Sequence, residues 1–97
     1  MVKYALLATV TAKPGKEAAV EQFLTSALEL AQQEEQTVSW YALKMDESTF
    51  GVFDTFNDEE GREAHLNGKI AAALMEHADE LLSSPPSIKK VELLAVK

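Results

Sequence analysis

Hydrophobic residues follow two patterns along the chain, and together they predict a mixed α+β fold. Residues 2–11, 37–45, 49–56 and 88–96 are rich in β-branched, aromatic and other apolar residues and read as strands. Residues 17–35 instead carry apolar side chains at spacings of three and four, which predicts an amphipathic helix of about five turns. A turn at Lys13-Pro14-Gly15-Lys16 separates the first strand from this helix.

A second helical region is predicted between the third and fourth strands. Asn57 or Asp58 can cap its N-terminus, and the Asn-Gly pair at 67–68 should interrupt it. Apolar positions resume over 70–81, and the two prolines at 85–86 end the helix. The resulting β-α-β-β-α-β order predicts a single ferredoxin-like domain over 1–97, with two helices on one face of a four-stranded antiparallel sheet.

The first and last predicted strands are apolar on both sides, although two helices can cover only one face of the sheet. A face that met water would alternate toward polar residues. We therefore expect a second copy of the chain to cover the open sheet face, in a two-fold homodimer. The alternative is that these strands are central and simply well buried.

The composition excludes several classes of function. Sixteen acidic and nine basic residues give a net charge of −7, which argues against nucleic acid and against an anionic membrane surface as partners. The chain lacks cysteine, so disulfides and thiolate catalysis are absent. No apolar run approaches the roughly 20 residues of a membrane span, and the N-terminus lacks a signal-peptide layout. These features predict a cytoplasmic protein.

Recognisable cofactor motifs are also missing. The four glycines are scattered and form no phosphate-binding loop, and there is no G-x-S-x-G nucleophile motif. The two histidines, His65 and His77, stand twelve residues apart with no spacing typical of metal ligands. We therefore expect neither a metal nor an organic cofactor.

Asp54 is the first candidate for chemistry, because it lies in the middle of an apolar strand. Alternation places it on the same side as Phe50, Val52 and Phe56. A carboxylate in such surroundings either finds a hydrogen-bond partner or has its pKa raised by desolvation, and a raised pKa suits a general base. The alternative is a structural role at a strand edge or an interface.

His65 and Arg62 follow on the next helix. Gly61 lies one turn before His65, where the absence of a side chain leaves space beside an imidazole that can exchange protons near neutral pH. The alternative for His65 is a partly buried residue at the helix break. Arg62 stands four residues after Asp58, so it forms either an exposed ion pair with that residue or an anchor for an anionic or phenolate substrate.

Two aromatic residues in the second strand complete the candidate set. Trp40 and Tyr41 should face opposite sides of the sheet, one toward the helices and one toward the open face. Such residues usually belong to a core or an interface, and either ring could also stack on a flat aromatic ligand.

The residues from 39–43, 48–56 and 58–68 resemble the antibiotic biosynthesis monooxygenase family. The shared pattern is a strand of acidic and aromatic residues followed by a short acidic helix that reaches Ala64-His65-Leu66. The segment 81–88 is also similar to one branch of the family. The resemblance implies a dimeric α+β barrel, and family members include small oxygenases that act on quinols, anthrones and related polyketides without metal or flavin.

This resemblance also implies roles for individual residues. His65 falls on the family's histidine and would act as base or substrate anchor, assisted by Asp54. The candidate walls of an aromatic pocket are Trp40, Phe53 and Phe56. Haem binding is not implied, because the haem-degrading branch has an asparagine on the first strand and this chain has none before Asn57. The sequence leaves three functions open: a cofactor-independent monooxygenase, a non-catalytic module that binds a small apolar ligand, and a structural domain with a filled core.

Overall fold

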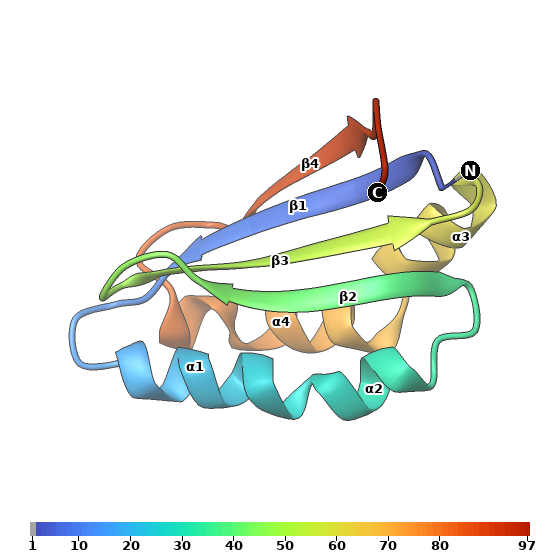
Figure 1. Ribbon diagram of the computed structural model, residues 1–97. Coiled ribbons are helices and arrows are strands. Elements are labelled where there is room, and N and C mark those ends of the chain that lie inside the picture. The colour runs from blue at the N-terminus through green and yellow to red at the C-terminus, as the bar shows by residue number, and fades with distance from the viewer. Residues whose placement is uncertain (1) are drawn as a thin grey trace.

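The computed structural model describes residues 2–97 and has the predicted βαββαβ order (Figure 1). Four strands form one antiparallel sheet in the order β2-β3-β1-β4, and the helices lie together against one face of it (Figure 1). The elements are β1 (Tyr4–Thr11), α1 (Glu17–Ser26), α2 (Leu28–Gln32), β2 (Thr37–Lys44), β3 (Thr49–Phe56), α3 (Glu59–Leu66), α4 (Lys69–Leu81) and β4 (Ser87–Glu92). The ferredoxin-like prediction is confirmed.

The first helical region differs from the single helix predicted over 17–35. It is divided into α1 and α2 at Ala27, and the second piece ends at Gln32. The N–H of Ala27 is shared between the carbonyls of Phe23 and Leu24, and its ψ of −14° tightens the backbone toward a 3₁₀ turn. The early end matters for the site, because Glu34 then lies in the turn before β2.

The last strand is shorter than the predicted 88–96. β4 ends at Glu92, and Leu93 makes one further backbone hydrogen bond of 2.7 Å to the carbonyl of Lys3. Beyond this point β1 offers no further partner, because β1 itself begins at Tyr4. The prediction that the whole of this segment is a strand was therefore wrong, and Leu94 is 88% exposed.

The predicted cap and break of the second helical region are both present. The Asp58 side chain accepts a 2.8 Å hydrogen bond from the N–H of Gly61 and starts α3. The helix stops at Leu66, and α4 begins after Gly68. A Cβ on Gly68 would lie 3.2 Å from a carboxylate oxygen of Glu34, so this glycine lets the turn before β2 approach the helix junction closely.

The core lies between the sheet and the helices, in two parts. The larger part gathers Val10, Val20, Leu24 and Phe50, while a smaller one around Ile70 includes alanines of the first helical region and packs against Trp40. The opposite sheet face carries Tyr41, which is half exposed. Trp40 and Tyr41 thus face opposite sides, as the alternation predicts. Among residues 2–97, no helix combines the length and the apolar character needed to span a membrane.

Candidate functional site

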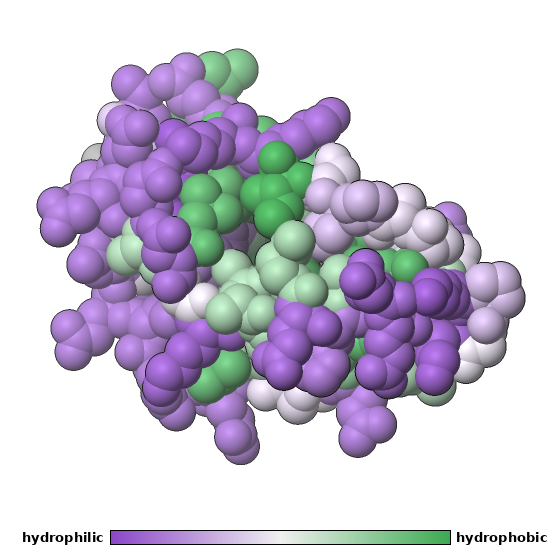
Figure 2. All heavy atoms as spheres, turned by 180° about the vertical axis from the view of Figure 1, so that it is seen from behind, coloured by the Kyte–Doolittle hydropathy of each residue, from purple (hydrophilic) through white to green (hydrophobic). Residues whose placement is uncertain are grey.

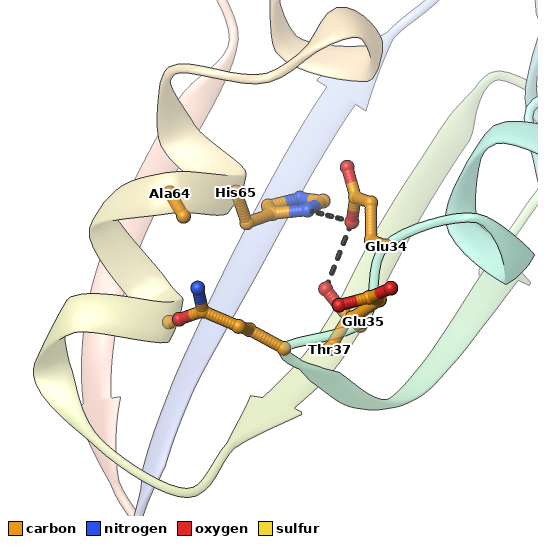
Figure 3. A pocket seen from close by; sticks show the side chains of 7 residues that line it. Glu34, Glu35, Thr37, Ala64 and His65 are labelled. Atoms are coloured by element: carbon orange, nitrogen blue, oxygen red, sulfur yellow. Dashed lines mark hydrogen bonds and ion pairs between the residues drawn. The ribbon is translucent and has the colours of Figure 1, made fainter.

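Three side chains from distant parts of the chain form a buried charged cluster, with His65 in the middle. His65 Nε2 lies 2.9 Å from Oδ2 of Asp54, and Nδ1 lies 2.7 Å from Oε1 of Glu34. β3 supplies Asp54, α3 supplies His65, and the turn between α2 and β2 supplies Glu34. Figure 3 shows the imidazole and the Glu34 carboxylate pointing toward each other. Asp54 therefore has the buried partner that its apolar surroundings require.

Glu34 was not predicted as a site residue. Thr37, at the start of β2, donates a 2.8 Å hydrogen bond to the same Oε1 atom that faces His65 (Figure 3). In the sequence Glu34 stands beside a second glutamate and 31 residues before the histidine. No local motif distinguishes it, so only the tertiary contact identifies it.

The cluster sets the protonation state of His65. Burial by itself lowers the pKa of His65, but the carboxylates of Asp54 and Glu34 outweigh this effect and raise the pKa to about 9. The imidazole is therefore positively charged at neutral pH and has no free nitrogen to accept a proton. This state disfavours His65 as the base that the family resemblance suggests.

Asp54 retains unused hydrogen-bonding capacity although it is almost completely buried. Its Oδ2 atom lies 2.9 Å from Nε2 of His65, and no other donor of residues 2–97 bonds to it. An ionised carboxylate has about four acceptor sites on its two oxygens, so Asp54 can accept a further hydrogen bond from a donor that enters the site. The side chain is 2% exposed, so such a donor must come through the protein interior.

A small apolar cavity reaches this carboxylate. Its volume is about 50 Å³, and Asp54 and His65 are the only charged groups in its lining. The hydrocarbon wall includes Leu6, Ala8, Val52, Leu24, Ile70 and Leu74. The space is enough for a few molecules the size of water or dioxygen but is smaller than the roughly 150 Å³ that encloses a benzene ring.

Part of the cavity lining comes from α4 and β4, which lie at the back in Figure 1, the side that Figure 2 shows. There Ala71 and Leu74 of α4 and Ile88 of β4 contribute to its lining, and Ile88 is 43% exposed. Figure 2 shows apolar atoms gathered around a hollow in this face. A ligand larger than the enclosed space would therefore project through an apolar mouth between α4 and β4.

A second, polar cleft lies on the other side of His65 (Figure 3). Its volume is about 240 Å³, and its lining includes Glu34, Glu35, Gln36, Thr37, Gly61 and His65. A Cβ on Gly61 would lie 3.2 Å from the carbonyl oxygen of Gln36. Gly61 thus gives the predicted free space beside the imidazole, and the turn before β2 fills part of it. His65 separates an apolar interior from a polar exterior.

Comparison with known proteins places this chain in a family. No model of a known protein family and no curated protein sequence matches the chain. The NE2512 protein of Nitrosomonas europaea, a protein of unknown function, is 64% identical over 100% of this chain and 94% of its own, with a TM-score of 0.98. The chain belongs to the NE2512 family.

More distant structures connect the NE2512 family to a wider fold. Two proteins provisionally described as antibiotic biosynthesis monooxygenases share the fold at 14% identity. The one from Nitrosomonas europaea is covered over 90% of its length by 95% of this chain, with a TM-score of 0.82. The one from Caulobacter crescentus is covered over 92% by 97% of this chain, with a TM-score of 0.80. The resemblance to that family is confirmed, and at this identity it shows the fold.

The predicted aromatic residues are distributed over both sheet faces. The buried Phe56 ring lies 5.6 Å from the His65 ring, and Trp40 pairs in register with Asp54. The buried indole Nε1 of Trp40 lacks a hydrogen-bond partner within the described chain. Phe53 lies on the open face, where it lines a groove with Tyr41. The fold thus brings Phe56 and Trp40 to the Asp54 region and leaves Phe53 on the opposite face. None of the three predicted wall residues lines the cavity beside Asp54.

Arg62 lies apart from both cavities of the cluster. It is buried, with its guanidinium 5.2 Å from the Tyr4 ring and 3.4 Å from the carbonyls of Ala5 and Val91. The exposed ion pair with Asp58 does not form, because the Asp58 side chain caps α3 instead. Its predicted role as a substrate anchor is not supported by a contact with the cavity.

The carboxylates and histidines of residues 2–97 form no group of three or more arranged to hold a metal ion. Within the Asp54–His65–Glu34 cluster, both ring nitrogens already face carboxylates. A metal ligand needs a nitrogen lone pair. The donor set around His65 thus fits a proton-bearing imidazole better than a metal ligand.

Proposed function

We propose that this protein is a cofactor-independent monooxygenase that oxidises a small phenolic, quinol or polyketide-like aromatic with O₂. The observation that carries the proposal is the buried carboxylate of Asp54 at the wall of an apolar cavity, 2.9 Å from the imidazole of His65. The fold shared with proteins described as monooxygenases supports the same reaction class. A water-poor wall beside a charged carboxylate is the environment in which a phenol loses its proton to a general base.

The reaction begins when the substrate O–H bond breaks. The proton moves to Asp54, and the electron pair stays on the substrate oxygen. The electron-rich anion passes one electron to O₂, and the substrate radical and superoxide then combine through a new C–O bond. The proton returns from Asp54 to the peroxide oxygen. The C–H bond at the oxygenated carbon and the O–O bond then break, and loss of water leaves the carbonyl product.

The cavity size limits which part of a substrate can enter. About 50 Å³ of enclosed space accommodates O₂ and one edge of a ring, and the rest of the molecule would lie at the mouth between α4 and β4. We therefore expect small phenols and hydroquinones to react better than large polycyclic substrates.

We also propose that two copies of the chain associate through the open sheet faces. That face has a groove of about 430 Å³ lined by Val38, Tyr41, Phe53 and the end of the chain, and Val38 and Tyr41 are half exposed. Exposed apolar groups gathered on one sheet face are typical of an association surface. Sedimentation should show a dimer for the unchanged protein and a monomer for Tyr41→Asp. A monomer in both cases would refute the dimer.

Oxygen uptake measured with an electrode tests the proposed reaction. A panel of hydroquinones, naphthols and anthrones is offered to the protein and to Asp54→Asn, with autoxidation of each substrate as the baseline. Asp79→Asn, on the exposed side of α4, is the matched control. We expect uptake above the baseline in the unchanged protein and in the control, and none in Asp54→Asn. Retention of these compounds without turnover would favour the non-catalytic binding module instead.

A further inference from the structure

Glu34 meets His65 from the side opposite to Asp54, and this arrangement determines what the imidazole can do. An ionised carboxylate only accepts hydrogen bonds, so each ring nitrogen that faces one must carry a hydrogen. Nδ1 lies 2.7 Å from Glu34 and Nε2 lies 2.9 Å from Asp54. With one carboxylate alone, the ring could remain neutral and present its other nitrogen as an acceptor. The second carboxylate removes that option.

The position of Glu34 is itself fixed by two parts of the fold. Thr37 of β2 donates to Oε1, the atom that also faces the imidazole. Gly68, between α3 and α4, leaves room for the other carboxylate oxygen, because a Cβ there would lie 3.2 Å from it. The Glu34 side chain is 20% exposed, against 9% for His65 and 2% for Asp54. The carboxylate is therefore held in one place at the boundary between the cluster and the polar cleft.

We propose that Glu34 is a positioning residue that acts through His65, holding the ring in its doubly protonated form so that Asp54 serves as the base facing the cavity. The catalytic consequence rests on the proposed function, whereas the effect of Glu34 on the protonation of His65 does not. The consequence for substrates is specific: the cavity presents an anionic acceptor and accommodates a neutral donor such as a phenolic O–H. An anionic ligand would be repelled.

The other charged groups near this cluster do not pair with the imidazole. From the turn before β2, Glu35 lines the same polar cleft as Glu34 but forms no ion pair or hydrogen bond with His65. From α4, Lys69 lines a neighbouring depression beside Glu34. Facing the ring itself are Asp54 from β3 and Glu34 from the turn.

Titration of the His65 ring by NMR tests the proposal without any substrate. Glu34→Gln keeps the shape of the side chain and removes its charge, and Glu35→Gln is the matched control one residue away. We expect the pKa of His65 to fall by at least about one unit in Glu34→Gln and to stay unchanged in Glu35→Gln. An unchanged pKa in Glu34→Gln would overturn the proposal, as would equal shifts in the two variants.

Two milder variants allow the proposal to be tested even if Glu34→Gln does not fold. Thr37→Val removes the hydroxyl that holds Oε1, and Glu34→Asp keeps the charge on a shorter side chain. We expect a smaller decrease in the His65 pKa for Thr37→Val than for Glu34→Gln, and partial recovery for Glu34→Asp. A decrease in Glu34→Asp as large as that in Glu34→Gln would indicate that packing, and not the charge, is responsible, and would contradict the proposal.

Oxygen uptake against pH gives the catalytic consequence a separate readout. In Glu34→Gln the alkaline limit of activity should move down together with the His65 pKa, whereas Asp54→Asn should be inactive at every pH. If the limit stays in place while the pKa moves, Glu34 does not act on the reaction through His65. If no substrate reacts with the unchanged protein, the proposed function fails, and the NMR titration still decides the role of Glu34.

Discussion

His65 and Arg62 are two buried basic side chains on the same short helix, three residues apart, but the groups that surround them differ. Both are less than one-tenth exposed. His65 lies between two carboxylates at hydrogen-bond distances, beside an apolar cavity. Arg62 faces backbone carbonyls at 3.4 Å and the Tyr4 ring, and it forms no ion pair with a carboxylate of residues 2–97.

This difference indicates that the His65 side chain contributes through its charge, whereas the Arg62 side chain contributes mainly through packing. Two carboxylates around one imidazolium leave a net negative charge in the protein interior, and burial of a net charge costs stability. Arg62 instead covers the junction of α3 with β1 and β4. Much of its contribution to stability comes from the packing of the aliphatic part of its side chain. The predictions below test this contrast, starting with the largest expected effect.

Asp54→Asn should abolish most of the activity, and Arg62→Met should preserve it. Loss of a general base lowers the rate by about 10² to 10⁴. We therefore expect oxygen uptake to fall at least about 100-fold in Asp54→Asn and to stay within about threefold in Arg62→Met. The comparison is made with one substrate under identical conditions. A large loss of activity in Arg62→Met would restore the arginine as a substrate anchor.

The stability of the protein should depend on pH through His65. Its pKa in the folded protein, about 9, is above the ordinary value of 6.5. The stabilisation from its ion pairs is therefore fully present below about pH 6.5 and lost as the pH rises through 9, amounting to about 3 kcal/mol. Urea unfolding at pH 6 and pH 10 measures this change.

His65→Gln provides the control for that pH dependence. The difference in unfolding free energy between the unchanged protein and His65→Gln should be larger at pH 6 than at pH 10. The same substitution at the exposed His77 should leave the difference constant. If the difference in unfolding free energy changed with pH in the same way for the two histidine variants, the carboxylates would not stabilise a charged imidazole.

Ala71→Leu should block the cavity mouth without disturbing the cluster. Ala71 lines the cavity from α4, and a larger side chain there occupies space that a substrate needs. We expect oxygen uptake to fall about tenfold, which corresponds to about 1.4 kcal/mol, while the NMR titration of His65 stays unchanged. Unchanged uptake would mean that substrates reach Asp54 by another route.

Arg62→Met should have the smallest effect on stability. A buried charge without a carboxylate partner contributes little net stability, and methionine fills a similar volume. Loss of the contact with Tyr4 costs about 0.5 to 1 kcal/mol. The free energy of unfolding should therefore stay within about 1 kcal/mol of the unchanged protein in urea titrations at pH 7. A loss of several kcal/mol would show that Arg62 carries an essential interaction.

Several elements followed from local pattern alone. The strand over 49–56, the cap at Asp58 and the helix break at 67–68 all agree with the structure. Each depends on chemistry within a few residues: alternation in a strand, a carboxylate near free N–H groups, and an Asn-Gly pair that interrupts a helix. The predictions failed at Ala27, where the first helical region tightens and divides, and beyond Glu92, where β1 has no more residues to pair.

The residues of the candidate site show the same contrast between what local sequence predicts and what it does not. An aspartate among apolar residues and a histidine on the following helix could be recognised from the sequence, because burial of such groups demands a partner or a function. Glu34 could not, since its carboxylate acts on His65 across 31 residues and resembles its neighbours in every local property. The ion pair considered between Arg62 and Asp58 is also absent, because the Asp58 carboxylate caps α3 instead.

Residue type and spacing decided which elements form and where Asp54 and His65 lie on them. Tertiary structure alone decided that the imidazole carries two hydrogens, because its pKa depends on the distances to Asp54 and Glu34 and on the exclusion of water. Those distances arise only when β3, α3 and the turn before β2 pack together. Local sequence determines backbone conformation through short-range contacts, whereas electrostatic energy depends on charges that the chain brings together from far apart.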